Sequence, residues 1–567
     1  MADVESIKSS STYLAGNLAA ELGRPQTWFG PDSAQLLKFH GVYQQDDRDL
    51  RRELQRAGLD RAYTMMVRAS IPGGALTAEQ YLAADRLADE VGNGTLRITT
   101  RQGLQWHLVP KRDLATLIRA LNENLVTTLA ACGDVARNVV ACPAPLPGRD
   151  DLLEHARRLA VAVRPRTASY WDLWLDGQRA VSAVPPPDPD SDVEPLYGPT
   201  YLPRKFKIGF AHTGDNCSDV YTNDVGIVPI RADHDGAIAG FTLLVGGGLG
   251  MTHNKPATFP RLADPLATIR PDELVDVVTA IIGVQRDHGD RSDRKHARMK
   301  YLVEEWGLPR FRSEVEDRLG RRLPEAVPLT WEATDDHLGW HGQSGGRWFI
   351  GVPVPAGRVA DEPGRRLRTA VRDLVADLGL GVRFTARQDL LLTDVEVDRR
   401  AEVTQRLHAA GVPLVEDLPR VSRHALACPA LPTCGLALTE AERALPAVTQ
   451  RFAAELERLG IPGAPVHLRV TGCPNGCARP YSTEIGVVGR GREHYTVHLG
   501  GDAQGTRLNH LFADRIHLDD LVPVLSPVLA AWRDERREGE PFGDWCDRVG
   551  VAALAERFPA NAVAVSP

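Results

Sequence analysis

The alternation of apolar and polar residues between positions 63 and 125 predicts a small unit of mixed strands and helices. Runs with every second residue apolar are typical of half-buried strands, and apolar residues three and four apart are typical of helices. The predicted elements are, in order, a strand at 64–70, a turn at 72–74, a helix at 78–91, strands at 95–100 and 104–108, and a helix at 112–122. Helical patterns return at 265–325, 437–459 and 517–538.

The same unit occurs a second time farther along the chain. Residues 96–104 match 382–390, and residues 137–144 match 423–430, both at an offset of 286; residues 241–248 echo 495–502. Repeats in the same order predict two homologous halves, a pseudo-two-fold axis and an α+β fold with a central site between the halves. The predicted divisions are a wrapping arm at 1–60, a repeat unit at 61–135, an α/β domain at 136–335, the second repeat unit at 336–420 and a metal-binding domain at 421–567.

Two pairs of cysteines on broken loops are the strongest chemical signal. Three residues separate Cys473 from Cys477, among Pro474, Gly476 and Pro480, and five residues separate Cys428 from Cys434, among further prolines. Proline and glycine hold such segments on irregular turns that present sulfur to a metal. Four thiolates suit an iron–sulfur cubane. A structural zinc site is the alternative, but the Cys-x5-Cys spacing exceeds that of a zinc knuckle, and disulfides are disfavoured in a chain predicted to be cytoplasmic.

These cysteine motifs, with Gly-Leu-Ala-Leu-Thr-Glu-Ala-Glu-Arg after Cys434 and Ala-Arg-Pro-Tyr after Cys477, resemble the sirohaem-containing assimilatory sulfite reductases of the nitrite/sulfite reductase superfamily. The resemblance covers nearly the whole chain. It implies two ferredoxin-like half-domains in the repeat units, a sirohaem and substrate domain at 136–335, and a [4Fe–4S] cluster held by Cys428, Cys434, Cys473 and Cys477. It also implies that Cys477 bridges the cluster to the iron of sirohaem.

Basic residues in the first half complement the cysteines of the second. Sirohaem carries eight carboxylates, and burying such a polyanion requires fixed cations. The resemblance implies that Arg68, Arg137, Lys205 and Lys207 face the substrate, and that sirohaem is contacted by Arg97, Arg101, Gln105, Arg204 and Asn475. Only eight of the 67 basic residues are lysines, yet two lie together at 205 and 207. A lysine can release a proton where an arginine cannot, so this pair suits proton donation; a solvated basic turn is the alternative.

The combination predicts the six-electron reduction of sulfite to sulfide. A haem iron coupled to a cluster through a shared thiolate can accept electrons singly, while cations hold the sulfite oxygens. Nitrite reduction by the same cofactors is the closest alternative, but the nitrite enzymes carry asparagine where this chain has Lys207. An iron–sulfur electron-transfer protein without a substrate is the alternative of another class. No nucleotide fingerprint is present, so ferredoxin or an NADPH-dependent flavoprotein is the expected donor.

The remaining features narrow the class of protein. A chain of 567 residues is too long for one core. The net charge of −7 gives no basic field for nucleic acid, and no apolar run is long enough to span a membrane, so a cytoplasmic protein is expected. We assign Cys132, Cys142, Cys217 and Cys546 to packing, residues 246–250 to a tight turn near the cofactor and residues 185–189 to a stiff linker.

Overall fold

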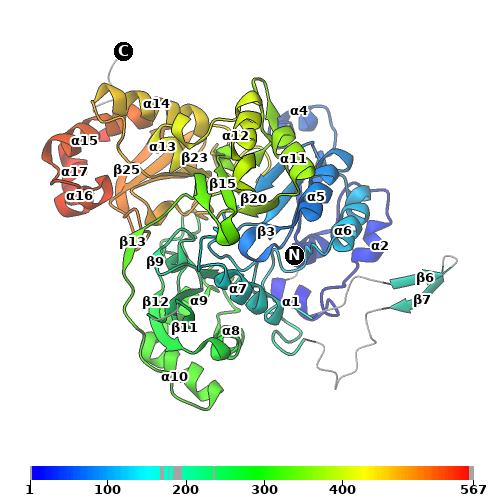
Figure 1. The fold of residues 1–567 in the computed structure, drawn as a ribbon. Helices are drawn as coiled ribbons and strands as arrows, with labels where there is room; N and C mark the ends of the chain where they lie inside the picture. Colours follow the sequence, from blue (N-terminus) through cyan, green and yellow to red (C-terminus); the bar gives the residue numbers. More distant parts are fainter. Residues whose placement is uncertain (1–2, 167–171, 176–177, 183–193, 234–235, 561–567) are drawn as a thin grey trace.

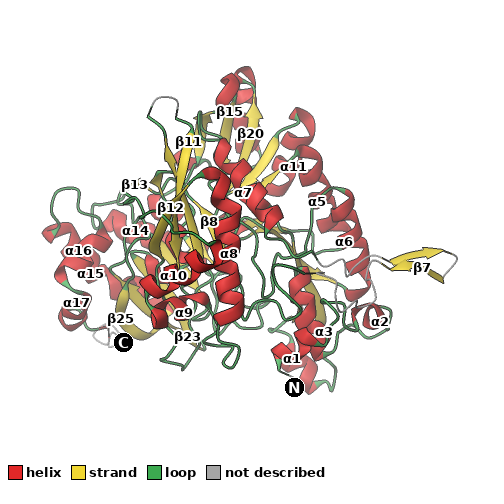
Figure 2. Ribbon diagram, turned by 90° about the horizontal axis from the view of Figure 1, so that it is seen from below, coloured by secondary structure: helices red, strands yellow, loops and turns green. Residues whose placement is uncertain are grey.

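A computed structural model describes residues 3–166, 172–175, 178–182, 194–233 and 236–560. Its body combines two sheets of the repeat units with two further sheets, one in each half of the chain. In Figure 1 the helices of the repeat units, α5, α6, α11 and α12, lie on the opposite side of the molecule from α14–α17 near the C-terminus. Figure 2 shows α8 and α10 beside β11 and β12.

The repeat units form two five-stranded sheets that exchange an edge strand. The first sheet has the order β1-β2-β5-β4-β16 and the second β14-β15-β20-β19-β3, so β16 of the second unit joins the first sheet and β3 of the first unit joins the second. The strands of the first unit are β1 (Val42–Asp46), β2 (Tyr63–Arg68), β3 (Ala75–Leu76), β4 (Leu96–Ile98) and β5 (Leu104–Val109), and its helices are α5 (Ala78–Glu90) and α6 (Leu114–Glu123). The second unit contains β14 (Gly339–Gly342), β15 (Trp348–Val352), β16 (Arg358–Val359), β19 (Gly381–Phe384), β20 (Leu390–Val395), α11 (Leu367–Leu378) and α12 (Arg400–Ala409).

Two glutamines hold the exchanged units together. Gln102 Nε2 donates to the carbonyl of Phe384 in the second unit at 2.8 Å, and Gln388 Nε2 donates to the carbonyl of Ile98 in the first at 3.3 Å. Both glutamines have positive φ, at the same place of the Thr-x-x-Gln turn in each repeat. The turn chemistry of the repeat therefore also joins its two copies.

The other two sheets also share one topology. The first-half sheet has the order β12-β11-β10-β8, and the second-half sheet β25-β24-β23-β22-β21. Their strands are β8 (Ile208–Phe210), β10 (Val225–Arg231), β11 (Ile238–Val245), β12 (Asp264–Ile269), β21 (Leu426–Ala427), β22 (Leu468–Thr471), β23 (Ile485–Gly491), β24 (His494–Leu499) and β25 (His510–His517). The covering helices are α7 (Asp151–Ala162), α8 (Leu274–His288), α9 (Met299–Trp306), α10 (Leu308–Leu319), α13 (Arg420–Arg423), α14 (Leu445–Arg458), α15 (Leu521–Glu535), α16 (Phe542–Val549) and α17 (Val551–Arg557).

Strand register confirms the pseudo-two-fold relation. Val225 pairs with Ile208 in parallel in the first sheet, and Ile485 pairs with Leu468 in parallel in the second, an offset of 260 for both partners. The bridge between Val140 and Gly209 corresponds to the pair of Leu426 with Arg469. The predicted α+β fold of two homologous halves is thus confirmed.

Two strands were not predicted. Residues 42–46, within the segment expected to be an arm, form the edge strand β1 of the first sheet, and the short helices α1 (Val4–Ser9), α2 (Leu18–Leu22), α3 (Pro31–Leu36) and α4 (Arg51–Arg56) lie before and after it in the sequence. The segment predicted as helical from residue 265 begins instead with the strand β12. Its short apolar run is equally consistent with a helix or a strand. The short strands β9 (Gly214–Asp215) and β13 (Trp331–Ala333) pair with each other, as do β17 (Asp361–Glu362) with β18 (Arg365–Arg366) and β6 (Asp172–Leu175) with β7 (Gln178–Ser182). The linker predicted at 185–189 lies outside the described residues.

Candidate functional site

Both predicted cysteine loops follow neighbouring parallel strands of one sheet. Cys428 comes directly after β21, and Cys473 lies two residues after β22, which pairs with β21. A hydrogen bond joins the two loops: the N–H of Gly472 donates to the sulfur of Cys428 at 3.3 Å. A Cβ at Gly472 would lie 2.7 Å from the Cβ of Ala430, so only glycine allows this approach.

The four thiols lie near one another at this edge of the sheet, but they are farther apart than the ligands of a single metal ion. Burial, together with the charges of Cys477, Cys434 and Cys473, raises the pKa of Cys428 above its ordinary value. Burial and the charge of Cys477 likewise raise the pKa of Cys473 to about 11. Within the described residues, no three of these four sulfur atoms all lie within 4.8 Å of one another. A wider set of four thiols fits a group larger than one ion, such as a cluster.

Cys477 is exposed, and residues of the first half surround its loop. Thr100 Oγ1 donates to the carbonyl oxygen of Cys477 at 3.0 Å, and Arg479 donates back to the carbonyl of Thr100 at 3.0 Å. Arg479 also pairs with the buried Asp219, and Asp219 pairs with Arg469 at 3.1 Å. These contacts fix the thiol that faces the first half.

Lys205 and Lys207 lie beside this loop with their ammonium groups uncommitted. Neither Nζ atom has a hydrogen bond or ion pair among the described residues. Burial and the nearby Lys207 and Arg204 hold the pKa of Lys205 well below its ordinary value. Burial, with Arg298 and Arg101, lowers the pKa of Lys207 to about 7, although the Cys477 thiol opposes the shift. The surroundings of both ammonium groups therefore favour the loss of a proton.

Arg68 and Arg137 are close to a second pair of groups, Tyr43 and Cys132. Arg68 Nη1 donates to the sulfur of Cys132 at 2.9 Å, and its guanidinium carbon lies 5.9 Å from the centre of the Tyr43 ring. Burial would lower the pKa of Arg137, but the charges of Tyr43, Cys132 and Asp134 raise it overall. Tyr43 and Cys132 were not predicted as pocket residues, and Cys132 was assigned to packing.

The other residues predicted to contact the cofactor differ in how many hydrogen bonds and ion pairs they make within the protein. Arg97 is buried and donates to Glu442 at 2.8 Å and to the carbonyl of Ala427 at 3.1 Å, next to Cys428. Gln105 is buried against Arg68, with its amide turned so that its oxygen accepts from that guanidinium. Arg204 lies 4.0 Å from Asp134, and burial lowers its pKa to about 10. Asn475 Nδ2 is 3.5 Å from the sulfur of Cys473.

Arg101 carries a buried donor that nothing satisfies. Its terminal nitrogens donate to Asn223 at 2.7 Å and to the carbonyl of Asn138 at 2.6 Å. Its Nε has no hydrogen-bond partner in the described part of the chain. An unsatisfied buried N–H of this kind is suited to donate to an anionic group. The uncommitted lysines and this donor together fit a carboxylate-rich cofactor beside Cys477.

Arg298 and Lys300 belong to the same surroundings but were missed by the sequence predictions. Arg298 is buried and pairs with Asp224 at 2.8 Å. Lys300 Nζ donates to the carbonyls of Gly248 and Gly250 at 2.9 Å each, and this glycine loop contacts the Cys473 loop, where Met251 N donates to the carbonyl of Pro474 at 2.8 Å. The scarcity of lysine, which marked 205 and 207, could also have marked Lys300.

The four remaining cysteines are buried, as packing requires, but not all in apolar surroundings. Cys546 packs in the apolar core of the C-terminal region. Cys142 and Cys217 instead lie with Asp215 and His337 in a compact polar group. For these two cysteines the packing assignment was incomplete, since their ligand-bearing neighbours come from segments far apart in the sequence.

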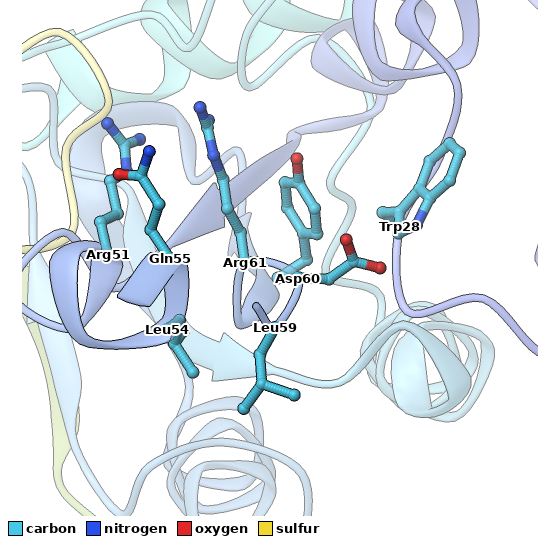
Figure 3. A pocket seen from close by; sticks show the side chains of 8 residues that line it. Trp28, Arg51, Leu54, Gln55, Leu59, Asp60 and Arg61 are labelled. Carbon is cyan, nitrogen blue, oxygen red and sulfur yellow. The ribbon is translucent and has the colours of Figure 1, made fainter. Parts of the chain in front are cut away.

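A surface hollow of about 540 Å³ lies elsewhere, between α4 and the start of β2. Figure 3 shows Arg51, Gln55 and Arg61 along one side of it and Leu54 and Leu59 at another. It is lined by none of the predicted cysteines or cations. No described helix is both long and apolar enough to cross a membrane.

Comparison with protein families gives two matches. The model described as the nitrite and sulphite reductase 4Fe–4S domain matches residues 154–323 and 421–562. The model described as the nitrite/sulfite reductase ferredoxin-like half domain matches residues 58–124 and 341–410. Each model matches twice, once in each half of the chain.

Individual proteins are similar over nearly the full length. A sulfite reductase [ferredoxin] of Synechococcus elongatus is 44% identical over 98% of this chain and 90% of its own. A sulfite reductase [NADPH] hemoprotein beta-component of Myxococcus xanthus is 42% identical over 97% of each chain. The solved structure of the Mycobacterium tuberculosis NirA protein is 25% identical, with a TM-score of 0.77 over 96% of this chain and 95% of that one.

Proposed function

Since the chain belongs to the nitrite and sulphite reductase family, we propose that it is an oxidoreductase that reduces sulfite to sulfide with sirohaem and a [4Fe–4S] cluster. The reaction converts SO₃²⁻, six electrons and six protons into S²⁻ and three molecules of water. When bound, the coupled cofactors supply the electrons singly and the iron that binds sulfur. The residues of the chain must hold the cofactors, bind the sulfite oxygens and deliver protons.

The observation that carries the proposal is the pair of uncommitted lysines beside an exposed thiol. Cys428, Cys434, Cys473 and Cys477 would hold the cluster, with Cys477 directed to the sirohaem iron. Arg101 with its orphaned Nε, Arg204 and Asn475 would contact the sirohaem carboxylates, while Gln105 and Arg97 would support them through Arg68 and the Cys428 loop. Arg68, Arg137, Lys205 and Lys207 would bind the sulfite oxygens.

The roles of the two lysines follow from their surroundings. A lysine whose pKa is held near 7 is charged enough to bind an anion and acidic enough to give a proton when an S–O bond breaks. Sulfite is a pyramidal dianion and uses a dense set of cations more fully than the planar nitrite monoanion. The charge density of the pocket therefore favours sulfite over nitrite.

The substrate assignment is tested by Lys207→Asn, with Lys295→Asn as a matched control, because Lys295 is an exposed lysine outside the pocket. Turnover of sulfite and nitrite is measured with the same reduced viologen dye. We expect Lys207→Asn to lower sulfite turnover more than nitrite turnover, and Lys295→Asn to change neither. An equal fall for both substrates would contradict the discrimination argument, and wild-type protein without sulfide formation would overturn the function.

The cofactor assignment is tested by Cys477→Ser beside Cys546→Ser. An alcohol oxygen is a poor bridge between cluster and haem iron, so the first variant should lose the coupled cofactor spectrum and sulfite turnover. Cys546 packs remotely in the C-terminal core, so its variant should keep both. Full turnover with an unchanged spectrum in Cys477→Ser would refute the bridging role.

Electrons come from a separate protein, and the cluster edge near Cys434 is the proposed entry. Cys434 is partly exposed, and Leu436 beside it is 68% exposed. Arg48 donates to the carbonyl of Cys434 at 3.2 Å and so joins the N-terminal region to this edge. Parallel assays with reduced ferredoxin and with an NADPH-dependent flavoprotein reductase identify the donor, as similar proteins carry each of these names.

A further inference from the structure

We propose that Cys142, Asp215, Cys217 and His337 form a structural zinc site in the first half of the chain, distinct from the cluster cysteines. All four residues are buried, and one ligand atom of each lies within 4.8 Å of the others. The sulfur of Cys142 is 3.3 Å from Nε2 of His337. Two thiolates, an imidazole and a carboxylate form a four-ligand set suited to tetrahedral zinc.

The ligands are held in position by their own neighbours. Asp215 Oδ1 accepts from the backbone N–H groups of Cys217 at 3.1 Å and Asp335 at 3.0 Å. Its other oxygen remains for the site, 3.7 Å from Nε2 of His337. Behind the imidazole, Asp335 Oδ2 lies 3.6 Å from Nδ1 of His337. A carboxylate behind a histidine ligand orients the ring and fixes which nitrogen faces the metal.

A bound cation would balance the charge of this group when its thiols and its carboxyl group are ionised. Cys142, Cys217 and Asp215 bring up to three negative charges into the interior, and the one ion-pair partner of Asp215 among the described residues is His337. Buried charge without compensation is strongly unfavourable. His212, whose backbone bridges to Asp215, is also buried, and neither of its ring nitrogens has a hydrogen-bond partner in the described chain. A divalent ion would balance the charges at this point.

The pseudo-two-fold axis provides an independent argument. Cys142 occupies the position of Cys428 at the repeat offset of 286. The strand registers give an offset of 260 for the following segment, which places Cys217 at the position of Cys477. At the same offset Asp215 falls at the position of Asn475, between the two cysteines of the second loop. Two of the four proposed zinc ligands, Cys142 and Cys217, are therefore the counterparts of two proposed cluster ligands, and a third lies in the corresponding loop.

The difference between the two loops explains why the first would hold one ion. The loops have the same length, since residues 208 and 225 correspond to 468 and 485, but their ligands are spaced differently. One residue separates Asp215 from Cys217, whereas three separate Cys473 from Cys477, and the ligand atoms of the first half lie within 4.8 Å of one another. The fourth ligand, His337, comes from another segment of the chain and not from the position that corresponds to Cys434.

The site would join the connector between the two halves to the first sheet. His337 lies between β13 and β14, and β13 pairs with β9, where Ala333 is opposite Asp215. His337 has a positive φ of 56°, which is strained for a histidine and needs support from its surroundings. A zinc ion bound by His337 and by both cysteines would supply that support at the start of the second repeat unit.

The test is the metal content of the untagged wild-type protein and of three variants, measured by inductively coupled plasma mass spectrometry. We expect about one zinc per chain in the wild type and in Cys546→Ala, and at least about a tenfold loss in Cys142→Ala and Cys217→Ala, with iron unchanged. Asp335→Asn should weaken zinc retention against a chelator by about tenfold, because it acts only through His337. Wild-type protein without zinc, or variants that retain it fully, would overturn the proposal.

Zinc-edge X-ray absorption of the wild type keeps the proposal testable if the cysteine variants fail to fold. It should find sulfur at about 2.3 Å and nitrogen or oxygen at about 2.0 Å from zinc. A shell of nitrogen and oxygen alone, or a Cys142–Cys217 disulfide in unreduced peptides, would refute the site. These measurements involve no sulfite, so their outcome is independent of the proposed function.

Discussion

At the scale of single residues, the pocket depends on the difference between lysine and arginine. Both carry a positive charge, but an arginine starts from so high a pKa that Arg204 still has a pKa of about 10 when burial lowers it, whereas a buried lysine can reach a pKa near neutrality. Lys205 and Lys207 have uncommitted ammonium groups and lowered pKa values, whereas Arg97 and Arg298 are paired with Glu442 and Asp224. In the proposed reaction the lysines would change protonation, while the paired arginines would keep their positive charge.

Lys205→Arg separates proton donation from charge. Losing one well-placed proton donor typically lowers a rate by about 10²–10⁴-fold, while the retained charge keeps anion binding. We expect sulfite still to shift the haem spectrum and sulfide formation to fall by that factor. Lys205→Met removes the charge as well and should weaken binding too. Wild-type turnover in Lys205→Arg would show that the lysine acts as a charge alone.

At the scale of elements, close approach of two loops builds the cysteine edge. β21 and β22 run in parallel, so the loops that follow them emerge side by side. Gly472 then lies against Ala430 and under the carbonyl of Thr439, which a Cβ would approach to 2.8 Å. The distance between the two cysteine pairs is thus set by Gly472, which itself supplies no metal ligand.

Gly472→Ala should reduce cluster content by forcing these loops apart. Overpacking of this kind costs about 1–3 kcal/mol and here falls directly on the ligand loop. We expect acid-labile sulfide and iron per chain to fall. Gly463→Ala is the control, since a Cβ there meets nothing within 4 Å. Equal cluster content in both variants would show that the loops adapt without loss.

Asp389, in the second Thr-x-x-Gln turn, predicts a pH effect on stability. Its Oδ1 accepts from Val354 N at 2.9 Å, and burial raises its pKa to about 7 from an ordinary 3.8. A raised folded-state pKa means that its contribution to stability is complete below the unfolded pKa and is lost as pH rises through about 7.

Asp389→Asn keeps the acceptor and removes the charge. The stability of the variant relative to wild type should therefore increase with pH between 5 and 7, by up to about 1.4 kcal/mol per unit. Thermal midpoints of both proteins across this range measure the difference. Parallel pH curves would show that Asp389 keeps its ordinary pKa in the folded protein.

At the scale of the whole molecule, the two repeat units form one body through exchanged strands and a buried ion pair. Arg368 on α11 donates to Asp85 on α5 at 2.6 Å and also binds Asp89. Asp85 is 1% exposed, and its other charged neighbour, Arg372, is 3.8 Å away. The charges of one repeat unit are thus neutralised by the other.

Arg368→Ala should destabilise the protein by about 3–5 kcal/mol, because it leaves Asp85 buried without its closest partner. Adding Asp85→Asn should recover part of that loss. Arg406→Ala removes an ion pair to the exposed Asp377 and should cost at most about 1 kcal/mol. Thermal melts of the four proteins measure these effects; equal losses for Arg368→Ala and Arg406→Ala would refute the bridging role.

The sequence by itself determined the duplicated architecture and the cysteine loops. Both are predicted by patterns within the sequence: a repeat at a constant offset, alternating apolar residues, and cysteines spaced among prolines and glycines. Strand β1, with the sequence Val-Tyr-Gln-Gln-Asp, escaped prediction because it contains too few apolar residues to show an alternation. The strand at the start of 265–325 escaped prediction because a short apolar run has no unique period. The scarcity of lysine likewise marked residues 205 and 207 without any structure.

Only the tertiary structure decided which charged and sulfur-bearing side chains meet. It joined Arg97 to Glu442, 345 positions away, and Arg68 to Cys132, and it brought His337 to Cys142 across 195 positions. The physical reason is that hydrogen bonds and metal ligation act over a few ångströms, whereas the chain pattern fixes only which face of an element each residue occupies. Partners on different elements are chosen when the sheets pack and the two halves come together.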